Sequence, residues 1–102
     1  MSFVVINVLT VPPQMRAVLE DRFANRAGEV ERMDGFEHFE LLRPESGQDS
    51  YLVYTRWRSE DDFKAWMSSP AFGQGHAKSA ESGPASTGSE IWTFSVAQSK
   101  SV

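Results

Sequence analysis

The sequence predicts an α+β fold with the element order β-α-β-β-α-β, the ferredoxin-like arrangement. Three observations predict it. Runs dense in β-branched and aromatic residues open and close the chain. Two segments with apolar residues at helical spacing interrupt these runs, and a loop rich in turn-forming residues joins the two central runs. With 102 residues, we expect one domain over residues 1–98 and a frayed tail over 99–102.

The first strand is expected at residues 3–11, FVVINVLTV. Because successive side chains on a strand point to opposite faces, Asn7 lies in a row of apolar residues on one face. Two interpretations stay open for this polar side chain. It either bonds neighbouring backbone groups or points as a hydrogen-bond donor into a pocket.

The first helix is expected at residues 14–32, because Pro13 suits a first helical turn and apolar residues follow at helical spacing. This stripe contains Met15, Val18, Leu19, Phe23 and Ala27. Arg22 and Arg26 are four residues apart, so their guanidinium groups can converge on one anion. A solvated charged face is the more ordinary explanation of the same spacing.

Residues 36–43 and 50–58 predict the second and third strands, with residues 44–49 as the hairpin loop between them. In the third strand Val53, Thr55 and Trp57 alternate with three residues of the opposite face. His38 stands alone in the second strand. We expect it to be a surface residue.

The second helix begins with a capping signal. Ser59 is a good N-cap residue, and Asp62 three residues later completes a pattern similar to a capping box. Phe63, Trp66 and Met67 follow at positions i, i+3 and i+4, so they share one face. The helix must end before Pro70, which cannot continue a helix interior.

His76 follows in a glycine-containing segment, ahead of a loop at residues 79–90 that is rich in Gly, Ser and Pro. This loop is either a lid over a site or a plain connector. Residues 91–97 predict the last strand. We expect Trp66 and His76 to form two walls of one pocket, with Asn7 as a third group.

Composition excludes several classes of function. The net charge of −4 and the pI of about 5.1 argue against a nucleic-acid-binding protein. The chain has no cysteine, which excludes disulfides, zinc fingers, iron–sulfur clusters and thiol catalysis. The N-terminal apolar stretch lacks the features of a signal peptide, and no apolar run is long enough to span a membrane. We therefore expect a cytoplasmic protein without a membrane partner.

The predicted sheet leaves one face without cover. Two helices cover one face of a ferredoxin-like sheet, whereas the other face of this chain carries Val4, Ile6 and Val8. Two sheets packed face to face would bury these residues. We expect a homodimer built as an α+β barrel.

Several stretches match a known family over residues 3–97, and they are found in the first helix, in the second strand and around the second helix. They are Arg22-Phe23-Ala24, Gly35-Phe36, Phe39 with Leu41-Leu42-Arg43-Pro44, Phe63 with Ala65-Trp66, and Pro70-Ala71. With them the chain resembles the antibiotic-biosynthesis-monooxygenase superfamily, and within it the heme-degrading monooxygenases of the IsdG/MhuD type. The mycobacterial MhuD branch is the most similar. An Asn in the first strand, a Trp in the second helix and a His after it are that family's functional set, present here as Asn7, Trp66 and His76.

The resemblance implies a heme-degrading monooxygenase in which heme is both cofactor and substrate. It would use O2 and an external electron donor supplied by a reductase. His76 would be the axial ligand of the heme iron, Asn7 a neutral hydrogen-bond donor on the oxygen side, and Trp66 the residue that presses the macrocycle out of plane. His76 lies one position later than in the MhuD branch, at the spacing of IsdG-like members.

The resemblance also implies an apolar lining from Phe23 and Phe63, and Arg22 and Arg26 near the heme propionates. Two alternatives stay open. A cofactor-independent monooxygenase acting on an aromatic polyketide would leave His76 idle. A non-catalytic heme-binding protein would bind heme without degrading it.

Overall fold

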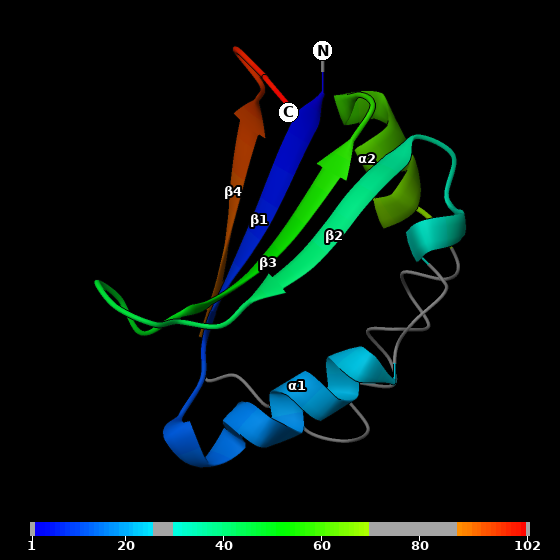
Figure 1. Cartoon of the computed structure of the whole chain (residues 1–102). Helices are drawn as coiled ribbons and strands as arrows, with labels where there is room; N and C mark the ends of the chain where they lie inside the picture. The colour runs from blue at the N-terminus through cyan, green and yellow to red at the C-terminus, as the bar shows by residue number, and fades with distance from the viewer. Residues whose placement is uncertain (1, 26–29, 70–87, 102) are drawn as a thin grey trace.

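The computed structural model describes residues 2–25, 30–69 and 88–101 (Figure 1). Four antiparallel strands form one sheet in the order β2-β3-β1-β4, which confirms the predicted ferredoxin-like fold. The strands are β1 Phe3–Thr10, β2 Phe36–Leu42, β3 Tyr51–Trp57 and β4 Gly88–Ser95. The helices are α1 Arg16–Ala24 and α2 Glu60–Met67. Arg26, His76 and most of the expected 79–90 loop lie outside the described residues.

The first helix is shorter than the sequence predicts. Instead of one helix over 14–32, α1 lies between two short 3-10 helices, Pro13–Met15 and Val30–Arg32. The helix ends where the Asn25 backbone N–H and side-chain amide both donate to the Asp21 carbonyl oxygen. Such side-chain bonds to the backbone compete with continued helix, and apolar periodicity alone does not reveal them.

The last strand begins three residues earlier than predicted, at Gly88 instead of residue 91, and ends at Ser95. Residues 88–90 are small or acidic and have little intrinsic preference for strands. They pair with the end of β1, where Thr10 is opposite Gly88 and Val8 is opposite Glu90. Backbone pairing along β1 therefore overrides local preference. The other three strands differ from the prediction by at most one residue at either end.

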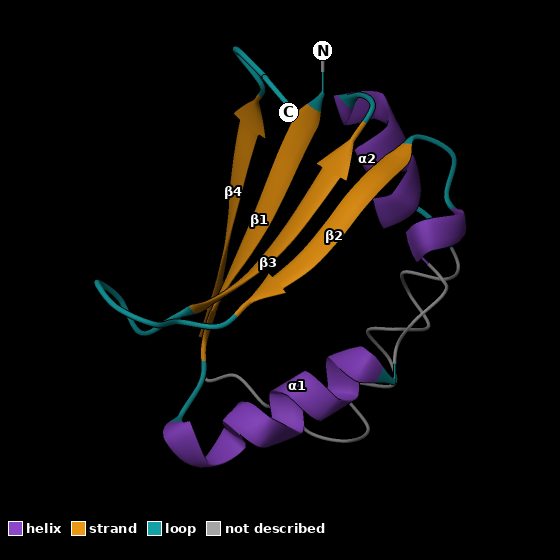
Figure 2. Cartoon of the chain, in the orientation of Figure 1, coloured by secondary structure: helices purple, strands orange, loops and turns teal. Residues whose placement is uncertain are grey.

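Helix α1 packs across one end of the sheet (Figure 2). Its contacts form a buried cluster of Leu9, Val11, Leu19 and Tyr51, with Met15, Phe23, Leu41 and Val53 packed around it. The Tyr51 hydroxyl donates a hydrogen bond to Glu20, 2.5 Å away, and Arg43 donates two more to the same carboxylate. These bonds, with Arg43 contributing most, lower the pKa of Glu20 to about 2. The helix is thus attached to the sheet by both apolar and ionic contacts.

Helix α2 is attached to the sheet through an aromatic cluster. The Phe63 ring lies 6.2 Å from the Phe3 ring and 5.7 Å from the Trp57 ring, measured between centroids. Phe36 contacts Trp57 edge-on at 5.4 Å. Trp57 is fully buried in this cluster. Aromatic contacts of this kind add directional preference to apolar burial, so they favour one orientation of α2.

The face of the sheet opposite the helices is apolar over β1 and β4. Val4 is paired with Phe94, and Ile6 with Trp92. Trp92 and Phe94 are 44% and 48% exposed. Over β2 the same face is polar, and there the exposed His38 lies 2.9 Å from Glu40 between Nε2 and Oε1, which confirms it as a surface residue.

The two edge strands differ in regularity. The β1–β4 register is continuous from the Phe3–Ser95 pair to the Thr10–Gly88 pair. In contrast, the register of β2 on β3 shifts between Phe36 and His38, as in a β-bulge.

Among the residues described, no helix is both long and apolar enough to cross a membrane.

Candidate functional site

A cavity of about 150 Å³ lies between α2 and the face of the sheet against which α2 packs. Its described walls come from β1, β3 and β4 of the sheet and from one side of α2. The lining residues are Val5, Asn7, Val53, Thr55, Phe63, Trp66, Met67 and Ile91. Six of these eight side chains are apolar, so a ligand here meets mostly hydrocarbon and aromatic surface.

The helical wall is the face that the sequence predicts. Phe63, Trp66 and Met67 all line the cavity, as their i, i+3, i+4 spacing requires. Ser59 caps the start of α2 by accepting a hydrogen bond from the Asp62 backbone N–H at 3.3 Å. At the other end the Ser69 hydroxyl donates to the Trp66 carbonyl oxygen at 2.6 Å. A serine hydroxyl therefore caps one backbone group at each end of this short helix.

Asn7 is central in the sheet wall, with Val53 opposite it on β3 and Ile91 opposite it on β4. It is half-buried, and within the described residues its side-chain amide makes no hydrogen bond. Because the side chain is only half-buried, water can satisfy the amide when no ligand is present, so the amide carries no penalty of an unsatisfied buried group. The amide is thus available to a molecule in the cavity.

Thr55, the other polar residue of the lining, has a different role. Its hydroxyl donates to the Val5 carbonyl oxygen at 3.1 Å and accepts from Trp57 Nε1 at 3.1 Å. The buried indole N–H is satisfied in this way. Because the Thr55 hydroxyl is already engaged, Asn7 is the polar side chain that can orient a ligand within the part of the lining that the structure describes.

Not all predicted site residues meet at this cavity. Phe23 stacks on Phe39 with ring centroids 6.0 Å apart and packs into the cluster beneath α1, so it is not part of the described lining. Arg22, in the last turn of α1, is also absent from the lining. Arg26 and His76 lie outside the described residues. Among the residues 2–25, 30–69 and 88–101, no group of three His, Asp or Glu is placed to hold a metal ion.

Apart from Asn7, the sheet residues of the lining were not singled out from the sequence as site residues. They are Val5, Val53, Thr55 and Ile91. A signal for them does exist, because the cross-strand partners of Asn7 share its face. Finding them requires the register of β1 with both neighbours. The predicted element order gives the neighbours but not the register.

The fold and the cavity together define a small α+β protein with a mainly apolar cavity between its sheet and its second helix. Residues 2–78 match the antibiotic biosynthesis monooxygenase family, ABM, and the chain belongs to this family. It is 42% identical over 98 residues to the mycobilin-producing heme oxygenase of Mycobacterium tuberculosis. That match covers 94% of this chain and 90% of the relative.

Solved structures agree with this assignment. The heme-degrader MhuD from Mycobacterium tuberculosis, with two hemes bound in its active site, superposes with a TM-score of 0.84 and 39% identity, covering 97% of this chain and 99% of that one. A variant of SnoaB, a cofactor-independent oxygenase from Streptomyces nogalater, superposes with a TM-score of 0.76 and 28% identity, covering 96% and 95%.

Proposed function

We propose that the protein is a heme-degrading monooxygenase. It binds heme as cofactor and substrate, opens the porphyrin oxidatively and releases the iron. The observation that carries this proposal is the Asn7 amide, which has no hydrogen-bond partner within the described residues and lies in the same apolar cavity as the Trp66 ring. The likeness to the mycobacterial heme oxygenase, over nearly the whole of both chains, supports the choice of heme as the ligand.

The residues present fit a porphyrin. Heme is a flat, largely apolar ring, and the described walls offer apolar side chains with one free polar group. The cavity of about 150 Å³ is smaller than the roughly 300 Å³ at the lower end of ligand pockets. The described walls therefore receive part of the macrocycle rather than enclose it.

Each proposed site residue has a distinct role. Trp66 and Phe63 would contact the face of a bound porphyrin, and Trp66 would press against that face. The Asn7 amide donates a hydrogen bond on the side where oxygen reacts, and as a neutral group it does so without delivering a proton. Bound heme supplies the iron at which dioxygen is activated. His76 is the residue proposed to hold this iron, through its neutral imidazole.

Arg22 and Arg26 are proposed partners of the two propionates, because guanidinium groups bind carboxylates in a two-pronged geometry. Phe23 is proposed as a more distant apolar support, since it packs beneath α1 rather than at the cavity. The reaction requires O2 and electrons. We propose that an external donor supplies these electrons through a reductase. We also propose that the protein is located in the cytoplasm.

A paired experiment tests the proposed function. Titration with hemin is expected to give a Soret band typical of histidine ligation, and addition of ascorbate in air is expected to bleach that band and release iron. A band that forms but survives ascorbate and oxygen would indicate a heme-binding protein without activity. If no specific band forms, the heme proposal is wrong.

A second candidate function has support from a specific observation. The cavity is mainly apolar, and the SnoaB structure shows the same fold in a cofactor-independent oxygenase. In that case the cavity would bind an aromatic polyketide, and dioxygen would react with the substrate directly. The two functions are separated by heme-free turnover of an aromatic polyketide in air, which would have to persist in His76→Ala.

We also propose that two copies associate through the open sheet face to form an α+β barrel. Trp92 and Phe94 leave an apolar surface beside Val4 and Ile6 that a second sheet would cover. Light scattering after size exclusion is expected to give twice the 11.4 kDa mass of one chain.

Replacing Trp92 with glutamate should convert this dimer to monomer, because a buried charge without a partner is strongly unfavourable at an interface. Val18→Glu is the matched control, because Val18 is 37% exposed on α1, away from this face. It should leave the mass unchanged. A parent protein that runs as a monomer at micromolar concentration would contradict the barrel.

A further inference from the structure

Beyond the residues that line the cavity, the contacts at the start of α2 point to a positioning device. We propose that Asp62 is a positioning residue: its carboxylate is held by Arg58 and Ser59 and fixes α2 so that Trp66 faces the sheet. The catalytic part of this inference depends on the proposed heme-degrading function. The structural part does not depend on that function.

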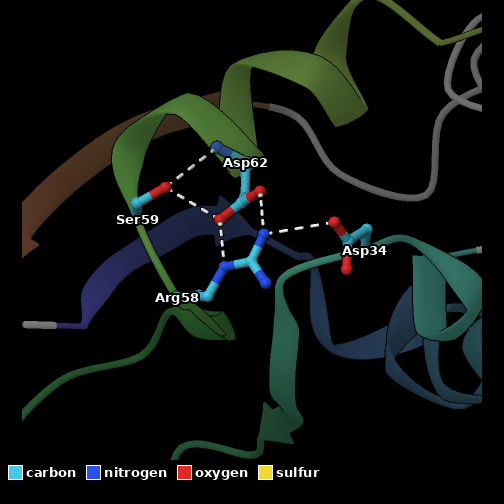
Figure 3. Close-up of polar contacts among 4 residues, drawn as sticks. All are labelled: Asp34, Arg58, Ser59 and Asp62. Carbon is cyan, nitrogen blue, oxygen red and sulfur yellow. Dashed lines mark hydrogen bonds and ion pairs between the residues drawn. The ribbon is translucent and has the colours of Figure 1, made fainter.

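The Asp62 carboxylate is held from two sides (Figure 3). Arg58 donates to both of its oxygens, from Nε to Oδ2 at 3.0 Å and from Nη2 to Oδ1 at 2.9 Å. The Ser59 hydroxyl donates to Oδ2 at 2.8 Å. Arg58 Nη2 also donates to Asp34 Oδ2 at 3.1 Å. This bond connects Arg58 to the turn before β2. A two-pronged arginine–carboxylate pair is geometrically specific, so it restrains direction as well as distance.

The close packing of Gly35 against Asp62 gives independent evidence that the position of this carboxylate is restrained. A Cβ atom added to Gly35 would lie 2.2 Å from Asp62 Cγ, a distance that no real side chain tolerates. Gly35 also has a φ of +86°, which only glycine adopts without strain. Its carbonyl oxygen accepts from the Arg58 backbone N–H at 2.7 Å. The Asp62 side chain, only 16% exposed, is therefore packed directly on the turn.

The position of this carboxylate controls the cavity wall because α2 is short. A helix of eight residues does not hold its orientation alone and depends on tertiary contacts. Trp66 follows Asp62 by four residues, so it lies one turn further along the same side of the helix. Fixing Asp62 against the turn therefore limits rotation of α2 about its axis, and such rotation would move Trp66 relative to Asn7.

The charge of Asp62 persists across neutral pH. The hydrogen bonds from Arg58, and then from Ser59, hold the pKa of Asp62 below its usual 3.8. The stabilising contacts are therefore fully present above about pH 4, and they are lost only as the pH falls through the lowered pKa.

The test uses protein labelled with 5-fluorotryptophan and read by ¹⁹F NMR without any ligand. Asp62→Asn keeps the shape of the side chain but removes its charge. We expect the Trp66 resonance to shift or broaden while that of Trp92, on the open face, stays in place. The matched control is Lys64→Ala, which removes an exposed 3.7 Å ion pair to Glu60 on the same helix. It should move neither resonance.

Activity is then measured on the hemin-loaded variants. Asp62→Asn should lower kcat by roughly tenfold or more, since small misplacement of a positioning group is costly. Arg58→Lys keeps the charge but loses the two-pronged geometry, so its Trp66 shift and rate loss should be intermediate. If Asp62→Asn does not fold, Arg58→Lys serves as the test variant in its place. An unmoved Trp66 resonance in the folded variant would overturn the inference, even if Tm falls. If the parent binds no hemin, the proposed function fails while the ¹⁹F result still decides the positioning role.

Discussion

Replacing His76 with alanine is expected to abolish heme degradation and to remove the Soret band typical of histidine ligation, while the protein remains folded. The reason is that the imidazole is the proposed ligand of the iron, and a protein that lacks this ligand cannot hold heme in the reactive arrangement. A ligating imidazole must be neutral. Heme binding by the parent should therefore weaken as the pH falls below the ordinary histidine pKa of about 6.5.

The control for this experiment is His38→Ala. His38 lies exposed on β2, beside Glu40 and edge-on to Tyr54, on the face opposite the cavity. This variant should keep the parent spectrum and rate. If His76→Ala binds heme with an unchanged spectrum and His38→Ala does not, the wrong histidine has been assigned. Circular dichroism of both variants would show that neither result reflects unfolding.

Asn7→Ala is expected to keep heme binding and lose most turnover. Removing a preorganised hydrogen-bond donor from an active site typically lowers kcat by about 100-fold or more. Binding should change little, because the apolar lining supplies most of the contact with the ring. The fold should tolerate the change, since in the described structure the amide has no partner to lose. Hemin titration and single-turnover kinetics with ascorbate would separate the two effects.

Asn25→Ala is a suitable comparison, because Asn25 ends α1 in an exposed position, where its amide bonds the Asp21 carbonyl. It should alter stability slightly and leave turnover unchanged. A parent-like rate in Asn7→Ala would show that the amide has no role in oxygen chemistry.

Much of this structure follows from local sequence signals. β-Branched runs predict the strands, and Ser59 with Asp62 predicts the start of α2. The spacing of Phe63, Trp66 and Met67 predicts the face that lines the cavity. These signals succeed because each depends on residues that are neighbours along the chain.

The rest depends on contacts between distant segments. The strand at Gly88 forms because β1 offers unpaired backbone groups there, which residues 88–90 do not reveal by themselves. Apolar periodicity marks Phe23 as buried but does not say whether it joins the core or the cavity. Likewise, the two-pronged pair between Arg58 and Asp62 appears in the sequence only as charges four residues apart.

The two edge strands, β2 and β4, differ in regularity, and this difference affects how the protein would aggregate. An added strand needs a regular row of free N–H and C=O groups, and a bulge at the edge interrupts that row. The register shift between Phe36 and His38 disturbs the outer rim at β2, whereas β4 runs in continuous register. Misassembly of this protein at high concentration, by strand addition toward fibrils, should therefore start at the rim formed by β4. Charged substitutions meant to improve solubility would be most useful on that rim.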